Sequence, residues 1–418
     1  MGGTKSNRSQ AVLLIFLAWL VYSISYVGKV NYSANITQVI DFYGVTKAQA
    51  GTPPTFFFFA YGIGQVLNGL FCKRYNIKWM VFGSFIVSAL INFIIAVSSD
   101  FAIIKWLWML NGISMSVLWP TLIRMLSENL PKKMLGTSSV AMGTTVATGT
   151  LVIYGLSSLF AAFDKFKYAF FVAAYVMVIV AIVWLIFYEM AVGASASAMK
   201  SEDSSSADVS SGQNRQSANG VKGLLLIVCI LCFCAIGVNL VKDGLCTWVP
   251  SILKDEFSFS DSLSIILTLF LPVIAMFGNA FALKIHRKIP DYVNHVSFIF
   301  LVAGVLMGVI IAGLNVKSVV MMLGGLVVVY FLISSLNSVI TSIFPMFMRE
   351  KLDSGKIAGI LNGFCYIGST VSSYGLGAVA DHFGWKAVFF VLMGFAAAVV
   401  AVWVVYTALK NFWNKKSI

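Results

Sequence analysis

The feature that most constrains this chain is a series of long apolar runs that recurs from one end to the other. The hydrocarbon core of a bilayer is about 30 Å thick, so a run of about 20 apolar residues predicts a helix that crosses it. The chain contains twelve such runs, at about residues 11–37, 48–72, 79–98, 101–127, 135–162, 168–191, 222–248, 260–284, 294–314, 317–347, 356–380 and 386–409. Their apolar residues are continuous, as in helices, and do not alternate as in the strands of a membrane barrel. We therefore predict an all-α membrane protein with twelve transmembrane helices.

Composition agrees with this class. Only 11% of the residues are charged, whereas about 25% is usual in soluble proteins. The first run is longer than the apolar core of a signal peptide, and no A-x-A-like cleavage site follows it. We expect this run to stay in the mature protein.

The positive charge of the chain, +13 at neutral pH, is distributed unevenly between the predicted loops. If both termini are cytoplasmic, 20 of the 29 basic residues lie on the cytoplasmic side and seven on the outer side. This is the positive-inside pattern. It predicts a multi-pass protein of the cell membrane with both termini in the cytoplasm. The basic excess reflects topology and attraction to anionic lipid, and we expect no nucleic-acid partner.

One polar segment interrupts the series of apolar runs. Residues 193–220 read GASASAMKSEDSSSADVSSGQNRQSANG, which is rich in serine and has no apolar periodicity. This composition predicts a flexible linker. Because it divides the runs six and six, we expect an N-terminal half (1–192), a cytoplasmic linker (193–221) and a C-terminal half (222–418).

The two predicted halves share sequence features at equivalent places. The fourth run ends in WPTLIRML and the tenth in FPMFMREK, which matches Pro120 and Arg124 to Pro345 and Arg349. The sixth and twelfth runs begin KYAFFV and KAVFFV. A six-plus-six repeat predicts two similar bundles with a binding site between them, near the midplane of the membrane.

Two lysines fall inside the predicted helices. Lys29 lies in the first run and Lys242 in the seventh, and these are the first helices of the two halves. A charge at the centre of a membrane helix costs about 2.5–3.5 kcal/mol on insertion scales, so packing alone does not explain it. At matching depths, the two lysines would face each other across a central cavity.

Three interpretations of these lysines stay open. Each side chain can extend to the headgroups. Lys242 can pair with Asp243, although adjacent residues of a helix point about 100° apart, which makes a direct bridge awkward. We favour the third interpretation, an anion site, because a phosphate monoester carries about −1.5 to −2 charges near neutral pH and would neutralise both lysines. Asp243 would reduce the cavity charge to +1, which suits a monoanion.

Further polar residues are expected to line the cavity. Tyr61, Gln65 and Asn68 share one face of the second helix, because residues three and four apart are neighbours on a helix. The fifth run contributes Thr144 and the eleventh Tyr366. No Walker A, zinc or nucleophile-elbow pattern occurs in the sequence. We therefore expect no enzyme, no cofactor and no metal, but a monomer that binds a small anion and either a counter-anion such as phosphate or a proton.

Several of these stretches resemble a known family. The similarity is carried by SYVGKVNYSA, AYGIGQVLNG, LWPTLIRMLSENLP, NLVKDGLCTWVPSILK and YIGSTVSSYGLGAVADHFGWKAVF. Over nearly its whole length the chain resembles the organophosphate:inorganic phosphate antiporters of the major facilitator superfamily, which include glycerol-3-phosphate and hexose-phosphate carriers. The resemblance implies the major facilitator fold of two six-helix halves, alternating access, and exchange of a sugar phosphate or glycerol phosphate for phosphate.

The resemblance also implies roles for single residues. In that family, helices one and seven each carry an arginine that binds the phosphate, and the matching positions here are Lys29 and Lys242. The charge is kept, but the planar fork of arginine is lost. The glycerol-3-phosphate carriers have a lysine where this chain has Gln65 and a histidine where it has Thr144. We expect substrate contacts from Lys29, Lys242, Tyr61, Gln65, Thr144 and Tyr366.

Two alternatives to the antiporter remain. GKVNYSA also resembles the anion:cation symporters, whose members carry sugar acids and other carboxylates, and Asp243 would then be the proton-coupling site. Some members of the antiporter family are sensors of external sugar phosphate that act with a partner kinase. The symporter predicts uptake that follows a pH gradient and needs Asp243. The sensor predicts little flux, and the antiporter predicts exchange that needs a counter-anion inside.

Overall fold

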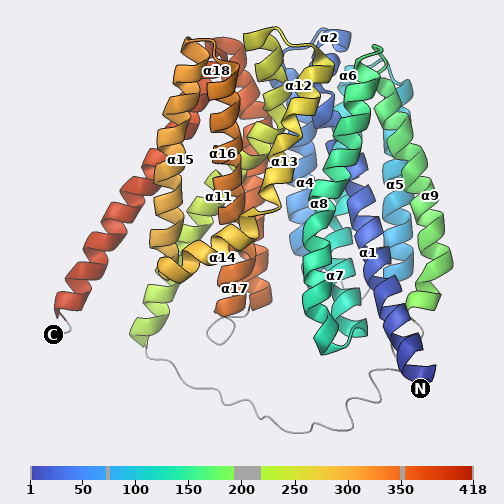
Figure 1. Ribbon diagram of the computed structural model, residues 1–418, viewed down its shortest axis with the longest axis horizontal. Coiled ribbons are helices and arrows are strands. Elements are labelled where there is room, and N and C mark those ends of the chain that lie inside the picture. Colours follow the sequence, from blue (N-terminus) through green and yellow to red (C-terminus); the bar gives the residue numbers. More distant parts are fainter. Residues whose placement is uncertain (1, 72–75, 193–217, 349–353, 417–418) are drawn as a thin grey trace.

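The computed structural model describes residues 2–71, 76–192, 218–348 and 354–416, and every regular element in these ranges is a helix (Figure 1). The first part of the chain forms α1 (Gly2–Ala34), α2 (Ile36–Tyr43), α3 (Lys47–Ala50), α4 (Thr52–Phe71), α5 (Ile77–Val97), α6 (Phe101–Ser116), α7 (Leu118–Asn129), α8 (Lys132–Ala161) and α9 (Lys167–Val192). The second part forms α11 (Ala218–Phe257), α12 (Asp261–Thr268), α13 (Phe270–Ala275), α14 (Gly278–Lys288), α15 (Tyr292–Asn315), α16 (Val319–Ser338), the π-helical turn η3 (Val339–Ile343), α17 (Phe344–Phe347) and α18 (Ser354–Lys416).

The helices account for the predicted number of membrane crossings. Within the described ranges, nine helices are long and apolar enough to span a membrane, and α12–α13 with α14 form a tenth span bent by 48°. The 63-residue α18 is too long for one crossing, and it is interrupted at Gly384, whose φ of 78° is not helical. Two crossings in α18 and one for the 20-residue α4 give the twelve predicted helices.

Prolines explain where predicted helices are interrupted. A proline inside a helix removes one hydrogen bond and clashes with the carbonyl four residues before it. Pro120 follows the break between α6 and α7, Pro272 follows the break between α12 and α13, and Pro345 follows η3. The continuous helices predicted for the fourth, eighth and tenth runs are therefore wrong in this detail.

Polar residues between the apolar runs begin several of the helices. The side chains of Asn76, Asp100, Ser260, Asp291 and Ser318 each accept a hydrogen bond from a backbone N–H in the first turn of the helix that follows. These caps satisfy N–H groups that have no partner within the helix. The same short polar segments that separate the runs thus also fix where helices begin.

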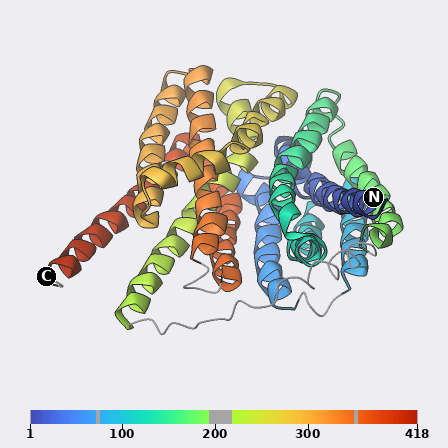
Figure 2. The same cartoon turned by 60° about the horizontal axis from the view of Figure 1, so that its bottom comes forward.

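The helices form two bundles that lie side by side, α1–α9 and α11–α18 (Figures 1 and 2). The bundles meet where α4 packs along α18 and where α8 contacts α12 and α13. The start of α1 and the end of α18 lie at the same end of the molecule, and so do α7 and α17, which hold the matched Pro120 and Pro345 (Figure 1). Arg349, and the predicted linker up to residue 217, lie outside the described residues. The helix after the linker begins at Ala218, four residues before the predicted start.

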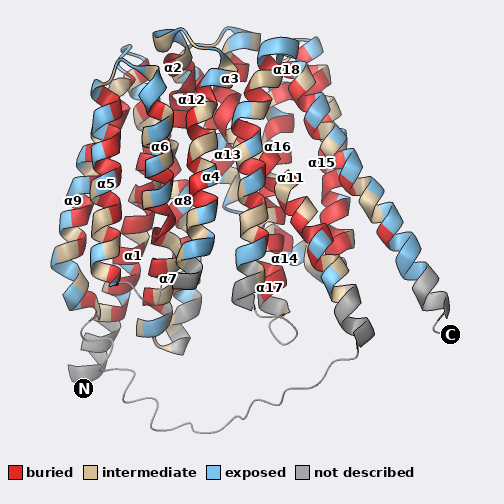
Figure 3. Cartoon of the chain, turned by 180° about the vertical axis from the view of Figure 1, so that it is seen from behind, coloured by how far each residue is buried: buried red, intermediate tan, exposed pale blue. Residues whose placement is uncertain are grey.

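Buried and exposed side chains are distributed as a bilayer requires. Buried residues face the inside of each bundle, and exposed residues follow the outward faces (Figure 3). Many of the exposed residues are large and apolar, such as Phe59, Trp79, Tyr175 and Phe390. In water such a surface would favour aggregation, whereas in lipid it is the expected outer face.

Candidate substrate cavity

A cavity of about 330 Å³ lies where the two bundles meet. Its wall is formed mainly by α1, α4 and α8 from one bundle and by α11, α13, α16 and α18 from the other. Three of its lining residues are charged, namely Lys29, Lys242 and Asp243, which leaves a net charge of +1 when all three are ionised. The prediction that the two intramembrane lysines face one central cavity is confirmed.

Lys29 is held by aromatic rings. The residue is only 7% exposed, and its Nζ donates to Tyr61 Oη at 3.5 Å. The same nitrogen lies 4.8, 4.7 and 5.0 Å from the ring centroids of Tyr22, Tyr26 and Tyr61. Cation–π contacts stabilise a desolvated ammonium by about 2 kcal/mol. No carboxylate in the described part of the chain lies within ion-pair distance of Lys29.

The backbone around Lys29 is fixed by buried amides from neighbouring helices. Asn111 on α6 donates its Nδ2 hydrogen to Gly28 O at 2.9 Å. Asn31 donates to Asn92 Oδ1 on α5 at 2.7 Å. Buried hydrogen bonds between membrane helices restrain their rotation and depth. This part of α1 therefore presents Lys29 to the cavity in a defined position.

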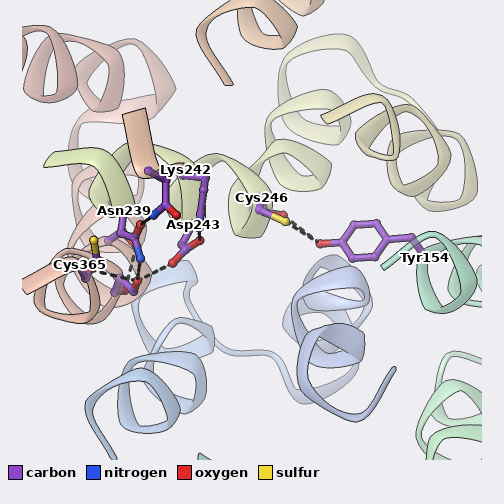
Figure 4. A network of polar contacts seen from close by, with 9 residues as sticks. Tyr154, Asn239, Lys242, Asp243, Cys246 and Cys365 are labelled. Carbon is purple, nitrogen blue, oxygen red and sulfur yellow. Dashed lines mark hydrogen bonds and ion pairs between the residues drawn. The ribbon is translucent and has the colours of Figure 1, made fainter. Parts of the chain in front are cut away.

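Lys242 differs from Lys29 because a carboxylate accompanies it. Its Nζ lies 3.5 Å from Asp243 Oδ1, and the other oxygen of that carboxylate accepts a hydrogen bond from Ser369 on α18. Figure 4 shows this network, which Asn239 extends by donating to Ser369 Oγ at 3.0 Å. The direct ion pair, which the helical geometry was expected to make awkward, does form here. The long lysine stem bends back to reach its neighbour although the two Cα–Cβ bonds diverge.

A hydrogen bond between α8 and α11 joins the two bundles. Pro250 lies inside α11 and cannot bond to the carbonyl of Cys246, four residues before it. Tyr154 on α8 donates its hydroxyl to that carbonyl at 3.1 Å (Figure 4). A backbone carbonyl in a membrane protein needs such a partner, because lipid offers none. Tyr154 thus supplies the hydrogen-bond donor for the Cys246 carbonyl on α11, across the interface between the bundles.

The other predicted site residues lie at different distances from the cavity. Tyr61 and Tyr366 line it, with ring centroids 5.1 Å apart. Gln65 lies just outside the lining, where it donates to Tyr61 Oη at 2.8 Å and accepts from Asn362 Nδ2 at 3.3 Å. Thr144 does not line the cavity; its hydroxyl accepts a hydrogen bond from Trp19 Nε1 at 3.0 Å.

Asn68, expected on the same face as Tyr61 and Gln65, also points elsewhere. Its amide donates to Gly64 O at 2.7 Å and to Ser116 Oγ at 3.0 Å, which ties α4 to α6. It contributes to packing between helices and does not line the cavity.

Several polar lining residues were not predicted from the sequence. They include Asn239 on α11 and Ser334 and Asn337 on α16. Asn337 donates to Asn239 Oδ1 at 3.0 Å, so they belong to the network of Lys242 and Asp243. Asn239 precedes Lys242 by three residues, and helical spacing places the two on one face. That spacing is the signal in the sequence that identifies Asn239, whereas the serines of α16 carry no comparable signal.

The end of the molecule opposite the termini is closed by contacts between the bundles. Lys47 on α3 pairs with Asp255 on α11 at 3.1 Å, and Lys254 pairs with Asp41 on α2. Asp381 on α18 accepts hydrogen bonds from the backbone N–H groups of Lys47 and Ala48, at 3.0 and 2.6 Å. Figure 1 places α2 and α12 at this end, away from both termini. The cavity is therefore sealed on this side by charged and polar contacts.

A bundle of twelve membrane helices with a central cavity and one sealed end is the architecture of a solute transporter. The family profile of the Major Facilitator Superfamily matches residues 18–373, and the chain belongs to this superfamily. The protein is a multi-pass membrane transporter with the major facilitator fold, and it is not an enzyme.

The chain is similar to sugar phosphate exchangers. It is 24% identical over 386 residues to Sugar phosphate exchanger 3 of Homo sapiens, with 82% of this chain and 77% of that protein covered. It is 23% identical to the protein of the same name from Mus musculus, over 387 residues and with the same coverage.

Solved structures share the fold at low identity. A bacterial homologue of the human lysosomal transporter Spinster, in an inward-facing and occupied conformation, gives a TM-score of 0.73 at 12% identity, over 94% of this chain and 96% of that one. The xylose transporter XylE from E. coli, in a partially occluded inward-open conformation, gives 0.69 at 11% identity, over 94% and 98%. The nucleoside transporter NupG gives 0.66 at 14% identity, over 95% and 99%.

Proposed function

We propose that this protein exchanges an organic phosphate, such as a sugar phosphate or glycerol phosphate, for inorganic phosphate across the cell membrane. The observation that carries the proposal is Lys29, a residue that lines the cavity, is 7% exposed and has no carboxylate partner among the described residues. A buried cation without a counter-charge is costly. An anion is therefore the ligand that this cavity stabilises most.

The phosphate class is supported by the similarity to proteins named sugar phosphate exchangers. Lysine binds phosphate as a point charge, and Lys29 presents such a charge to the cavity. Tyr61 adds a hydroxyl within reach of Lys29. These groups lie at the interface of the two bundles, where transporters of this architecture bind their substrates.

Exchange follows from the charge of the cavity. With an anion bound, Lys29 is neutralised and the bundles can close over it, whereas closure over the empty cavity encloses an uncompensated cation. The ion pairs at the sealed end separate when the bundles rock to open that side. We propose that both termini are cytoplasmic, since 20 of the 29 basic residues then lie on that side. The protein would act as a monomer, with residues 1–192 and 222–418 as its moving halves and residues 193–221 as their linker.

The test is uptake of labelled phosphate into proteoliposomes that are either loaded with unlabelled phosphate or empty. Exchange predicts rapid uptake into loaded vesicles, very little into empty ones, and equal stimulation when glucose 6-phosphate replaces the internal phosphate. Equal uptake into loaded and empty vesicles would rule out obligatory exchange. Absence of uptake in both would contradict the phosphate assignment.

Asp243 supports a second candidate, a proton-coupled symporter of carboxylates such as sugar acids. It is the one carboxylate among the lining residues described for the cavity, and it contacts Lys242. A symporter would drive uptake of labelled glucuronate under an inward proton gradient, and Asp243→Asn would abolish the dependence on that gradient. The antiporter proposal predicts no stimulation by the gradient in either protein.

A further inference from the structure

We propose that the two walls of the cavity bind different parts of one ligand: the α1–α4 wall takes the anionic group at Lys29, and the α11–α16 wall takes a hydroxyl-bearing carbon body. This inference rests on the proposed transport of an organic anion and adds which substrate class the cavity selects. The matched lysines of the repeat suggested a symmetrical site, but their surroundings differ.

The first observation is the distribution of charge. Lys242 has Asp243 at 3.5 Å, and Ser369 holds that carboxylate by a hydrogen bond. Lys29 has aromatic rings and one hydroxyl instead. The wall around Lys242 is therefore close to neutral, and the uncompensated charge of the cavity lies at Lys29. An anionic group is attracted to that side.

The second observation is the chemistry of the α11–α16 wall. Asn239, Asn337 and Ser334 line the cavity there, and the ionic groups of Lys242 and Asp243 lie among them. Amides, hydroxyls and a paired carboxylate offer both donors and acceptors, and a sugar hydroxyl needs both. A neutral polyol is bound by such groups without a net charge.

Ser334 provides the most direct indication of a ligand. The residue is 9% exposed and lines the cavity, while its Oγ is shielded and has no hydrogen-bond partner in the described structure. Most buried hydroxyls in proteins have a partner, as the next residue illustrates, since Ser335 Oγ donates to Leu332 O at 2.6 Å. Rotation about the Cα–Cβ bond of Ser334 turns this hydroxyl toward the cavity, and we infer that a ligand hydroxyl is then its partner.

The opposite wall has fewer groups of this kind: besides Lys29, only Tyr26, Ser33 and Tyr61 bring polar side chains to it from α1 and α4. Around Lys29 the cavity is lined by Phe57, Phe58, Tyr61 and Trp108. Such rings contact the C–H faces of a sugar but satisfy few of its hydroxyls. A ligand with one anionic end and several hydroxyls therefore fits one orientation, and a cavity of about 330 Å³ suits a small ligand such as a monosaccharide phosphate.

The test compares three probes as competitors of labelled phosphate exchange in proteoliposomes. Unlabelled phosphate has the anionic group alone, hexyl phosphate adds a carbon chain without hydroxyls, and glucose 6-phosphate adds the hydroxyls. Ser334→Ala should raise the half-inhibitory concentration of glucose 6-phosphate about three- to tenfold, the effect of one lost hydrogen bond. The values for phosphate and hexyl phosphate should change less than about twofold.

Ser335→Ala is the matched control, because it removes the same hydroxyl from the adjacent position, outside the cavity lining. It should leave all three values unchanged. Equal weakening of all three probes by Ser334→Ala would overturn the inference, because the α11–α16 wall would then bind the phosphate itself. No effect on any probe would also overturn it. A wild-type protein that exchanges no phosphate at all would instead refute the proposed function on which the inference rests.

Discussion

At the scale of single residues, Asp243 determines how much positive charge the cavity presents. Its carboxylate contacts Lys242 and is hydrogen-bonded to Ser369. Asp243→Asn keeps the shape and the acceptor oxygen but removes the negative charge. Two unit charges about 8 Å apart interact by about 2 kcal/mol at an effective dielectric constant near 20. We predict that this variant binds phosphate about 30-fold more tightly, as measured by the half-saturating concentration for exchange.

Ser369→Ala is the control for this prediction. It removes the hydrogen bond to the carboxylate but retains its charge, so it should not tighten phosphate binding. Weaker phosphate binding by Asp243→Asn would show that the carboxylate supports the site in another way, and would contradict the assignment of charge made above.

The sequence revealed those residues whose chemistry is unusual for their setting. Lys29 and Lys242 are identifiable because a charge inside an apolar run is rare. Ser334 and Asn337 are not, because hydroxyls and amides are common where membrane helices pack. Thr144 shows the converse, since a predicted site hydroxyl is occupied by Trp19. Only the positions of the neighbouring helices show which polar side chains line the cavity and which bond to another helix.

At the scale of helices, Tyr154 links the two bundles. Its hydroxyl bonds to the Cys246 carbonyl, which Pro250 leaves without a partner inside α11. Tyr154→Phe would leave the carbonyl of Cys246 without its donor, at a cost of about 1–3 kcal/mol. We predict that this variant shifts the protein toward the conformation that is open at the sealed end. The shift is measurable as faster alkylation of a cysteine placed at Ser33, which lines the cavity, by a reagent added from the outer side.

Tyr32→Phe is the matched variant for Tyr154→Phe. Tyr32 also donates its hydroxyl to a backbone carbonyl, that of Ala50 at 2.9 Å, but within one bundle. It should lower stability by a similar amount without changing the alkylation rate. Equal rates for both variants would mean that the Tyr154 contact does not hold the bundles together.

Close backbone contact at Gly51 offers a second test of the sealed end. A Cβ at Gly51, between α3 and α4, would lie 2.2 Å from the backbone oxygen of Ser373 on α18. Gly51→Ala should therefore separate α18 from the α3–α4 corner and increase alkylation from the outer side. Gly155→Ala on α8, where a Cβ meets nothing within 4 Å, should not. An unchanged rate in Gly51→Ala would contradict the role given to this contact.

Helix number could be predicted from the sequence, whereas helix continuity could not. The apolar runs define twelve crossings because the bilayer sets a minimum length. The breaks in the fourth, eighth and tenth runs depend on Pro120, Pro272 and Pro345, yet α11 continues through Pro250. At Pro250 a hydroxyl from α8 bonds to the freed carbonyl, and nothing in the sequence identifies Tyr154 as that donor.

At the scale of the whole molecule, two bundles similar in sequence enclose a cavity with dissimilar walls. The repeat predicted the equivalent placement of α1 and α11, and both do carry a lysine to the cavity. The asymmetry arises from the neighbours, aromatic rings around Lys29 and a carboxylate beside Lys242. Selection of an anion therefore depends on one lysine more than on the other.

The most direct test of this account is a calorimetric titration of the purified protein with phosphate, for wild type, Lys29→Met, Lys29→Arg and Lys105→Met. Loss of one partner of a close charge pair costs about 2–5 kcal/mol, so Lys29→Met should weaken phosphate binding by about 30-fold or more. Lys29→Arg keeps the charge and should retain binding. Lys105→Met, which removes a lysine outside the cavity lining, should match wild type. Phosphate binding by Lys29→Met at wild-type affinity would contradict the central claim that Lys29 is the anion's anchor.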